Sequence, residues 1–386
     1  MKLHEFVARR LILLVPVMVG VAVFTFTIAQ LIPADPAAAL CGEKCGVVVD
    51  YTEDGEPITA YDKNFIRLGL DKSVTERFFI YVDGLLNGDW GESVAYHRPV
   101  IEVVQDAAPI TLEMAFFALM IGYPVGIILG ILSAVMQDRI FDHLSRFMAI
   151  AFVSLPIFWL AMMLQYYLAT GEGVCDPLFG TEGGCFPLFG RHDSGFTYPQ
   201  STEEVSAFVS WYPHDGTGFH LIDSWFVTDE ALEELPDEYN TNWLLFYDTI
   251  EHLFLPSLTL GLASSGSLLR YMRSSLLEVM NEDYVRTARA KGLSESRTII
   301  VHACRNALVP IVTLLGFSIG GAIGGAVLTE SIFSFNGMGR VAVKSIQYLD
   351  FATIMGVTLI TSFIFLLSNL IVDVLYAVID PRVRLE

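Results

Sequence analysis

The sequence lacks the short motifs by which enzymes hold phosphates or activate nucleophiles. No Gly-x-x-x-x-Gly-Lys-Ser/Thr loop occurs, so the chain cannot hold ATP phosphates by that route. It also has no nucleophile elbow and no His-Glu-x-x-His pair, and its 8 His are scattered. We therefore expect no catalytic residue, no bound metal and no cofactor on this chain, and we predict that it is not an enzyme.

Charge is scarce, and positive charge most of all. Charged residues make up 17% of the chain and hydrophobic residues 53%, with 23 Lys and Arg against 43 Asp and Glu and a net charge of -20. This composition argues against an ordinary soluble domain and favours a membrane protein. We expect the lipid membrane, and not nucleic acid, as its surroundings.

Six apolar segments are long enough to cross a bilayer, which takes about 20 helical residues. They lie near residues 11–32, 108–136, 147–169, 252–272, 309–332 and 354–379. Backbone groups must be paired in lipid, and continuous apolar runs favour helices over a barrel. The first segment is longer than the apolar core of a cleaved signal peptide, so we prefer a retained span. Pro124 and Pro156 are expected to bend the second and third spans.

Basic residues indicate the cytoplasmic side. The N-terminus, residues 137–146, residues 270–306 and the C-terminus hold fourteen of the 23 Lys and Arg. Residues 33–107 and 170–250 hold seven of them and 29 of the 43 acids. The positive-inside rule places both termini in the cytoplasm and the two long loops outside.

The two outward loops are strongly acidic. Residues 33–107 carry fourteen acids and six bases, and residues 170–250 carry fifteen acids and one base. A solvated acidic surface is the simpler interpretation, and its density is typical of a halophilic, high-salt environment. Cation capture is the alternative, although no acid cluster has the spacing of a calcium loop. Residues 74–86 are amphipathic and predict an external helix on or near the membrane surface.

The loop 170–250 is an unusual acidic insert that begins with a small duplication. Residues 175–180 and 185–190 repeat the pattern Cys-x-Pro-Leu-Phe-Gly, and the rest has no clean periodicity, which suggests a small, partly disordered subdomain. Four cysteines lie on the outer, oxidising side, where disulfides can form: Cys41, Cys45, Cys175 and Cys185. A metal site or free thiols are the alternatives for these four residues.

The cytoplasmic stretch 281–310 predicts a charged helix, a turn and a second helix between two spans. Asn281 is a suitable N-cap, Gly292 can supply the left-handed residue that ends the first helix, and Ser294 can cap the second. A short charged helix in this place is better suited to docking than to catalysis. We expect a cytoplasmic partner to bind it.

The fifth and sixth spans contain small and ionisable residues of interest. The small residues form overlapping small-xxx-small spacings and predict a helix interface, within the subunit or between subunits: Gly316, Gly320, Gly321, Gly324 and Gly325. Ionisable residues in apolar segments are candidates for function. Glu330 is therefore a candidate for the transport pathway or its gate, and Asp373 is a weaker one.

These features resemble the membrane-spanning subunits of ABC importers, in particular the first permease type of the dipeptide, oligopeptide and nickel group. In that family the EAA loop before the penultimate helix docks in a groove of the ATP-hydrolysing subunit. The residues that match it here are Tyr284, Val285, Arg286, Thr287, Ala288, Arg289, Ala290, Lys291, Gly292 and Leu293. Arg286-Thr287-Ala288 replaces the usual Glu-Ala-Ala, and Cys304-Arg305 replaces Leu-Pro, both as in the first permease type.

Further familial motifs follow in order along most of the chain. They are Leu31-Ile-Pro-Ala-Asp-Pro36, Asn87-Gly-Asp-Trp-Gly-Glu-Ser93, Pro109-Ile-Thr-Leu-Glu113, Ser154-Leu-Pro-Ile-Phe-Trp159, Leu255-Pro-Ser-Leu258, Glu330-Ser-Ile-Phe-Ser-Phe-Asn-Gly-Met-Gly-Arg340 and Val372-Asp-Val-Leu-Tyr-Ala-Val-Ile-Asp-Pro-Arg382. Asn336 stands where a proline is usual, and residues 40–62 and 172–245 lie outside the resemblance.

The resemblance implies an all-α polytopic membrane protein with six transmembrane helices and the ABC importer type I permease fold. Its parts are then residues 1–32 (cytoplasmic end and first span), 33–107 (external loop), 108–169 (second and third spans), 170–250 (insert) and 251–386, with the coupling loop at 275–308. The implied location is the cell membrane.

The implied function is the permease half of an ATP-driven importer, most simply for di- and oligopeptides, with oligosaccharides or nickel as alternatives. The implied partners are a second permease subunit, two ATPase subunits that carry ATP and Mg, and an external solute-binding protein. A secondary transporter or a membrane-anchored binding module are the alternatives from other classes.

Overall fold

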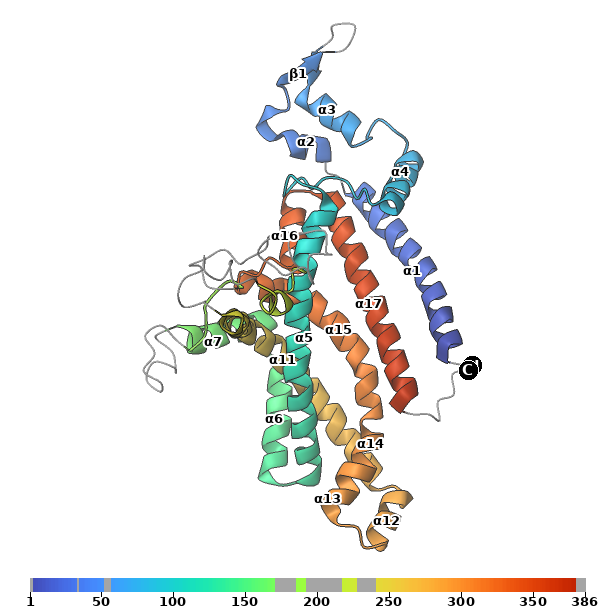
Figure 1. Cartoon of the computed structure of the whole chain (residues 1–386), viewed down its shortest axis with the longest axis vertical. Helices are drawn as coiled ribbons and strands as arrows, with labels where there is room; N and C mark the ends of the chain where they lie inside the picture. Colours follow the sequence, from blue (N-terminus) through green and yellow to red (C-terminus); the bar gives the residue numbers. More distant parts are fainter. Residues whose placement is uncertain are drawn as a thin grey trace. The chain divides into compact units, whose positions relative to one another are not determined.

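The computed structural model describes residues 3–32, 35–51, 57–170, 185–191, 217–227 and 241–379, which are mainly helical (Figure 1). The chain divides into two compact units. The first unit contains residues 1–8, 109–339 and 365–386, and the second contains residues 9–108 and 340–364. Most of the insert, with Cys175, lies outside the described residues.

Four helices among the described residues are long and apolar enough to cross a membrane. They are α1 (Leu3–Leu31), α5 (Val100–Val135), α11 (Asn242–Met280) and α17 (Phe351–Ile379). Two bent pairs pass the same test together: Ile140–Ser154 with Ile157–Ala169, and Glu295–Ala307 with Val309–Gly324. Counting each pair as one span gives up to six.

The predicted span 147–169 is wrong in its start and in its continuity. The structure has α6 (Ile140–Ser154) and α7 (Ile157–Ala169), which meet at an angle of 109°. Pro156 lies at the break, and Leu155 before it is extended, as expected for a residue that precedes proline. In contrast, α5 continues as a helix through Pro124.

α5 and α11 both extend well beyond the predicted apolar runs 108–136 and 252–272. α11 has 39 residues and begins before Asp248, Thr249 and His252, which are all buried. Because these polar side chains are enclosed by protein, the helix can include them without exposing them to lipid. Hydropathy alone therefore placed the start of this helix too late.

Close helix packing and two apolar clusters build the first unit. A Cβ at Gly126 would lie 2.6 Å from the Leu268 Cβ, and one at Gly130 would lie 2.7 Å from the Met272 Cβ. Glycines spaced four residues apart on α5 therefore allow close contact with α11. One cluster includes Met114, Leu253 and Phe335, and the other surrounds Met272 and continues into the loop after α11.

The second unit contains most of α1, the segment 35–108 and the end of α16 (Met338–Gln347) with the start of α17. It includes α2 (Pro36–Cys41), η1 (Gly42–Lys44), α3 (Ala60–Arg67) and α4 (Val74–Asn87). The helix predicted at 74–86 is confirmed as α4, which Ser73 caps at its start and the left-handed Gly88 ends, while its external location stays a prediction. An antiparallel pair, β1 (Val48–Tyr51) and β2 (Pro57–Thr59), shows that an all-α description is incomplete.

Candidate functional site

The charged stretch after α11 folds as the predicted short helix, α12 (Asp283–Ala290), followed by a turn and more helix (Figure 1). The predicted N-cap at Asn281 is wrong. Its backbone N–H donates to Glu278 O, and its side-chain amide donates to Leu277 O, so Asn281 closes α11. Glu282 is the N-cap of α12, and it makes no side-chain capping bond.

One face of α12 is fixed to the protein by apolar burial. Val285 is 0% exposed and Ala288 is 7% exposed, and their spacing of three residues puts them on the same helix face. Val285 belongs to the apolar cluster that contains Met272 and Leu276 of α11 and Ile311 of α15 (Val309–Ile332). The buried face of α12 therefore shares one apolar cluster with two of the long helices.

Gly292 ends α12 in the left-handed conformation, with φ +80°, as the sequence predicted. The Leu293 N–H donates to Ala288 O at 3.4 Å, and the Gly292 N–H donates to Arg289 O at 2.9 Å. This pair of bonds is a Schellman motif, which satisfies carbonyls at the helix end. The direction in which the chain leaves α12 thus depends on a backbone conformation that glycine adopts without strain.

The chain returns through α13 (Glu295–Arg297), η3 (Thr298–Ala303) and α14 (Cys304–Ala307). Ser294 lies at the N-cap of α13, as predicted, but its side chain makes no capping bond. The Arg289 guanidinium donates two hydrogen bonds to Glu295, at 2.7 and 3.1 Å, and the hydrogen bond to this carboxylate raises the pKa of Arg289. Asn306 donates to the Tyr284 hydroxyl at 2.7 Å. Polar contacts therefore hold α12 against the returning helices α13 and α14.

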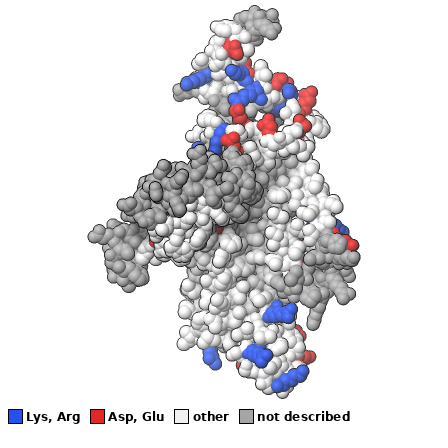
Figure 2. Space-filling model, viewed as in Figure 1, with Lys and Arg blue, Asp and Glu red and all other residues white. Residues whose placement is uncertain are grey.

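The remaining predicted coupling residues form the outer face of this loop. The exposed members are Tyr284, Arg286, Thr287, Ala290, Lys291 and Gly292, while Arg289 and Leu293 are half-buried. Figure 2 shows Lys and Arg gathered at the end of the first unit where α12, α13 and α14 lie. The surface combines positive charge with an apolar base, and its role in docking stays a prediction.

Glu330, the candidate for the pathway or gate, is fully buried near the end of α15. Its carboxylate accepts a hydrogen bond from the Thr111 hydroxyl of α5 at 2.6 Å. The Thr111 oxygen in turn accepts from the Met338 N–H at 2.8 Å. Thr111 therefore joins α5, α15 and the start of α16. It lies in a quoted family motif, but the sequence assigned it no role. A role for Glu330 in transport stays a prediction. Asp373 is half-buried in α17.

The glycines of α15 lie on different faces of the helix. A Cβ at Gly316 would lie 2.6 Å from the Asn369 side-chain oxygen, and one at Gly320 would meet the Phe365 ring, so these two pack against α17. A Cβ at Gly321 or at Gly324 would have no described atom within 4 Å. Gly325 lies within the same helix. Among the glycines whose surroundings the structure describes, Gly316 and Gly320 therefore form the contact within the chain.

The cysteines divide as follows. Cys41 and Cys45 are joined by a disulfide at the end of α2, and Cys185 is also disulfide-bonded. Cys304 is a buried free thiol. Cys175 lies outside the described residues.

The described parts of the insert are anchored on the first unit, which the sequence did not predict. Phe186 stacks on Phe254 of α11 with ring centroids 4.6 Å apart, and the Gln165 amide donates to Leu188 O at 2.7 Å. Arg191 forms an ion pair with Glu113 of α5. Glu113 lies in a quoted motif, but nothing in the sequence indicated which residue would pair with it.

The long apolar helices and the charged loop between two of them define a multi-pass membrane protein. Comparison with known families agrees. The family described as "Binding-protein-dependent transport system inner membrane component" matches residues 126–385, and the N-terminal part described for such membrane components matches residues 3–115.

Individual relatives match over almost the whole chain. A probable D,D-dipeptide transport system permease protein from Escherichia coli strain K12 is 40% identical over 373 residues, which are 96% of this chain and 94% of the relative. A dipeptide transport system permease protein from Alkalihalophilus pseudofirmus is 34% identical, covering 97% of this chain and 98% of the relative. A glutathione transport system permease protein from Salmonella paratyphi A is 31% identical, covering 98% and 99%.

The chain therefore belongs to the family of binding-protein-dependent transport system inner membrane components. It is a permease of the ABC importer type and a multi-pass protein of the inner membrane. The family resemblance stated from the sequence motifs is confirmed.

Proposed function

We propose that this chain is one of two permease subunits of an ATP-driven importer of di- and oligopeptides. The similarity to dipeptide and glutathione permeases supports this substrate class. The complete transporter would contain a second, distinct permease, two cytoplasmic ATPases that bind ATP and Mg, and an external solute-binding protein. The chain itself would bind no cofactor. Oligosaccharide or nickel import by the same machinery is the alternative for substrate.

The proposed topology has six spans with both termini in the cytoplasm. It is supported by up to six apolar helical spans among the described residues and by the basic residues of the loops that it places inside. The loop 281–310 would then face the ATPases, and the two acidic loops would face the solute-binding protein. Tags at each terminus, tested for access from either side of the membrane, would contradict the topology if one were external.

The observation that carries the proposed mechanism is that α12 buries one face, through Val285 and Ala288, while its opposite face is polar and exposed. ATPase closure would push on the outer face of α12. Because Val285 lies in the same apolar cluster as Met272 and Ile311, that push would reach α11 and α15 together. α15 leads to the buried contact between Glu330 and Thr111, so movement at the loop has a packed route toward the other end of the helix.

Reconstitution tests this proposal. The chain, its second permease, the ATPases and the solute-binding protein would be placed in proteoliposomes, and uptake of a labelled dipeptide measured with and without ATP. We expect uptake only with ATP and with every subunit present. Uptake that persists without the ATPases would favour a secondary transporter, and a chain that never co-purifies with an ATPase would favour a membrane-anchored binding module.

A further inference from the structure

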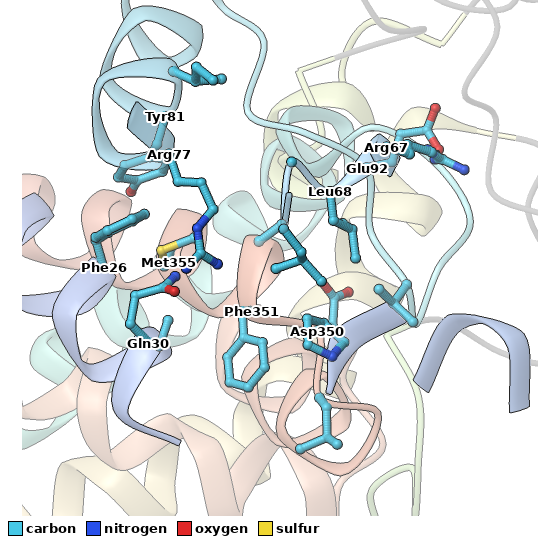
Figure 3. A pocket seen from close by; sticks show the side chains of 18 of the residues that line it. Phe26, Gln30, Arg67, Leu68, Arg77, Tyr81, Glu92, Asp350, Phe351 and Met355 are labelled. Atoms are coloured by element: carbon cyan, nitrogen blue, oxygen red, sulfur yellow. The ribbon is translucent and has the colours of Figure 1, made fainter. Parts of the chain in front are cut away.

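A cavity of about 360 Å³ in the second unit belongs neither to the docking loop nor to the buried contact of Glu330 (Figure 3). Its wall combines the last turns of α1, the turn after α3, one face of α4 and the start of α17. α1 and α17 are both apolar spans, and the residues that reach the cavity come from the end of one and the beginning of the other. The ends of membrane-spanning helices are expected at the level of the lipid headgroups, and the cavity lies at two such ends.

The cavity has an apolar side, and the helices that form it also carry exposed apolar side chains. Phe26, Ile80 and Met355 contribute to its wall. On the same helices, Phe24 and Leu31 of α1 are 65% and 75% exposed, and α4 exposes further apolar side chains. An amphipathic helix with this surface, beside a span end, is typical of the membrane interface.

The cavity also concentrates positive charge in a loop that is otherwise acidic. Three of the six bases in residues 33–107 contribute to its wall: Arg67, Lys72 and Arg77. The two acids of the wall are engaged. Glu92 pairs with Arg67, and Asp350 accepts hydrogen bonds from Ser93 at 2.5 Å and Thr353 at 2.7 Å.

Of Lys72 and Arg77, the two bases that these contacts leave, Arg77 is the one with a buried nitrogen. It extends from α4 toward Gln30 and Met355 (Figure 3). Its Nε is buried, and within the described residues it has no hydrogen-bond partner. A buried guanidinium nitrogen without an acceptor is costly, and phosphate oxygens are well matched to the guanidinium fork.

We propose that this cavity is a binding site for an anionic phospholipid, with the phosphate on Arg77 and an acyl chain along the apolar side. The volume is enough for a headgroup phosphate and a few methylenes, but not for a whole lipid. The chains would leave over the exposed face of α1. Bound in this way, a lipid would hold α4 against α1 and α17 at the boundary of the bilayer.

The test uses the purified transporter complex and three probes: phosphatidylglycerol, diacylglycerol, which has no phosphate, and glycerol 3-phosphate, which has no chains. Binding is measured by native mass spectrometry and by the rise in melting temperature. The variants are Arg77→Gln and a control, Lys63→Gln, which removes an exposed base outside the cavity wall. We expect Arg77→Gln to weaken phosphatidylglycerol roughly tenfold, and Lys63→Gln to leave it unchanged.

Three results would overturn the proposal. These are equal phosphatidylglycerol binding by Arg77→Gln, diacylglycerol binding as tight as phosphatidylglycerol, or glycerol 3-phosphate binding as tight as the lipid, which would identify a site for a soluble anion. If the Arg77→Gln complex does not assemble, Ala29→Phe is the second variant. It places a large side chain in the cavity and keeps Arg77. That variant should also lose the lipid, and full retention would contradict the site.

Discussion

Arg191 of the insert forms an ion pair with Glu113 of α5, and both side chains are largely buried. The same guanidinium donates to Gly218 O at 2.7 Å, while Glu113 accepts from the Leu221 N–H at 3.0 Å. Two separate segments of the insert, 185–191 and 217–227, are thus joined at one carboxylate of the helical unit. The insert is therefore part of the packed structure at this point.

Breaking this buried ion pair should lower the free energy of unfolding much more than breaking an exposed ion pair. Arg191→Met leaves Glu113 buried without its cation, which typically costs about 3–5 kcal/mol. Arg98→Met is the matched control, because Arg98 pairs with Asp106 at an exposed site, where the expected cost is below about 1 kcal/mol. Denaturation of the solubilised protein measures both. Equal losses would show that the buried pair has no special role.

Gly292 should be replaceable only by residues that tolerate the left-handed conformation. Gly292→Val places a β-branched residue at φ +80°, with an expected strain of about 1–3 kcal/mol, although nothing lies within 4 Å of the new Cβ. We expect ATP hydrolysis to continue and dipeptide uptake to fall. Gly292→Asn should keep most uptake, because asparagine adopts this conformation more readily. Normal uptake by Gly292→Val, at normal membrane levels, would contradict a coupling role for the turn.

Gly320 and Gly324 of α15 should respond differently to the same substitution. Gly320→Val would collide with the Phe365 ring, and we expect about 1–3 kcal/mol of destabilisation from overpacking. Gly324→Val meets nothing within 4 Å among the described residues and should leave the chain's resistance to proteolysis in membranes unchanged. A strong effect of Gly324→Val on assembly, but not on the chain alone, would indicate that this face meets another subunit.

The stability of the first turn of α4 should depend on pH. The Ser73 N–H and hydroxyl donate to Glu76, and these bonds lower the pKa of Glu76. A carboxyl with a lowered pKa stabilises the folded state above its unfolded pKa, and this contribution is lost as the pH falls through the folded value. Hydrogen exchange of the α4 amides measures it. We expect Ser73→Ala to increase opening roughly fivefold at neutral pH, and Glu76→Gln to remove the pH dependence; an unchanged profile in Glu76→Gln would assign it to another group.

Local rules worked where the causes are local. Hydropathy located the apolar helices, and the Gly292 helix end followed from backbone preference alone. They failed at Asn281, where a residue suited to begin one helix instead closes the preceding one. They failed again at the start of α11, because burial within protein protects polar residues that hydropathy counts against a span.

The sequence by itself determined the membrane class, the charged loop between two spans and, through ordered motifs, the transport family. These are properties of segments, which hydropathy, charge and backbone conformation fix one stretch at a time. Only the tertiary structure decided that Arg191 would neutralise Glu113, that Gly126 and Gly130 would admit α11, and that Arg77 would face a cavity. Each of these contacts joins residues that are far apart in the sequence. Packing and desolvation determine such contacts only when the helices come together.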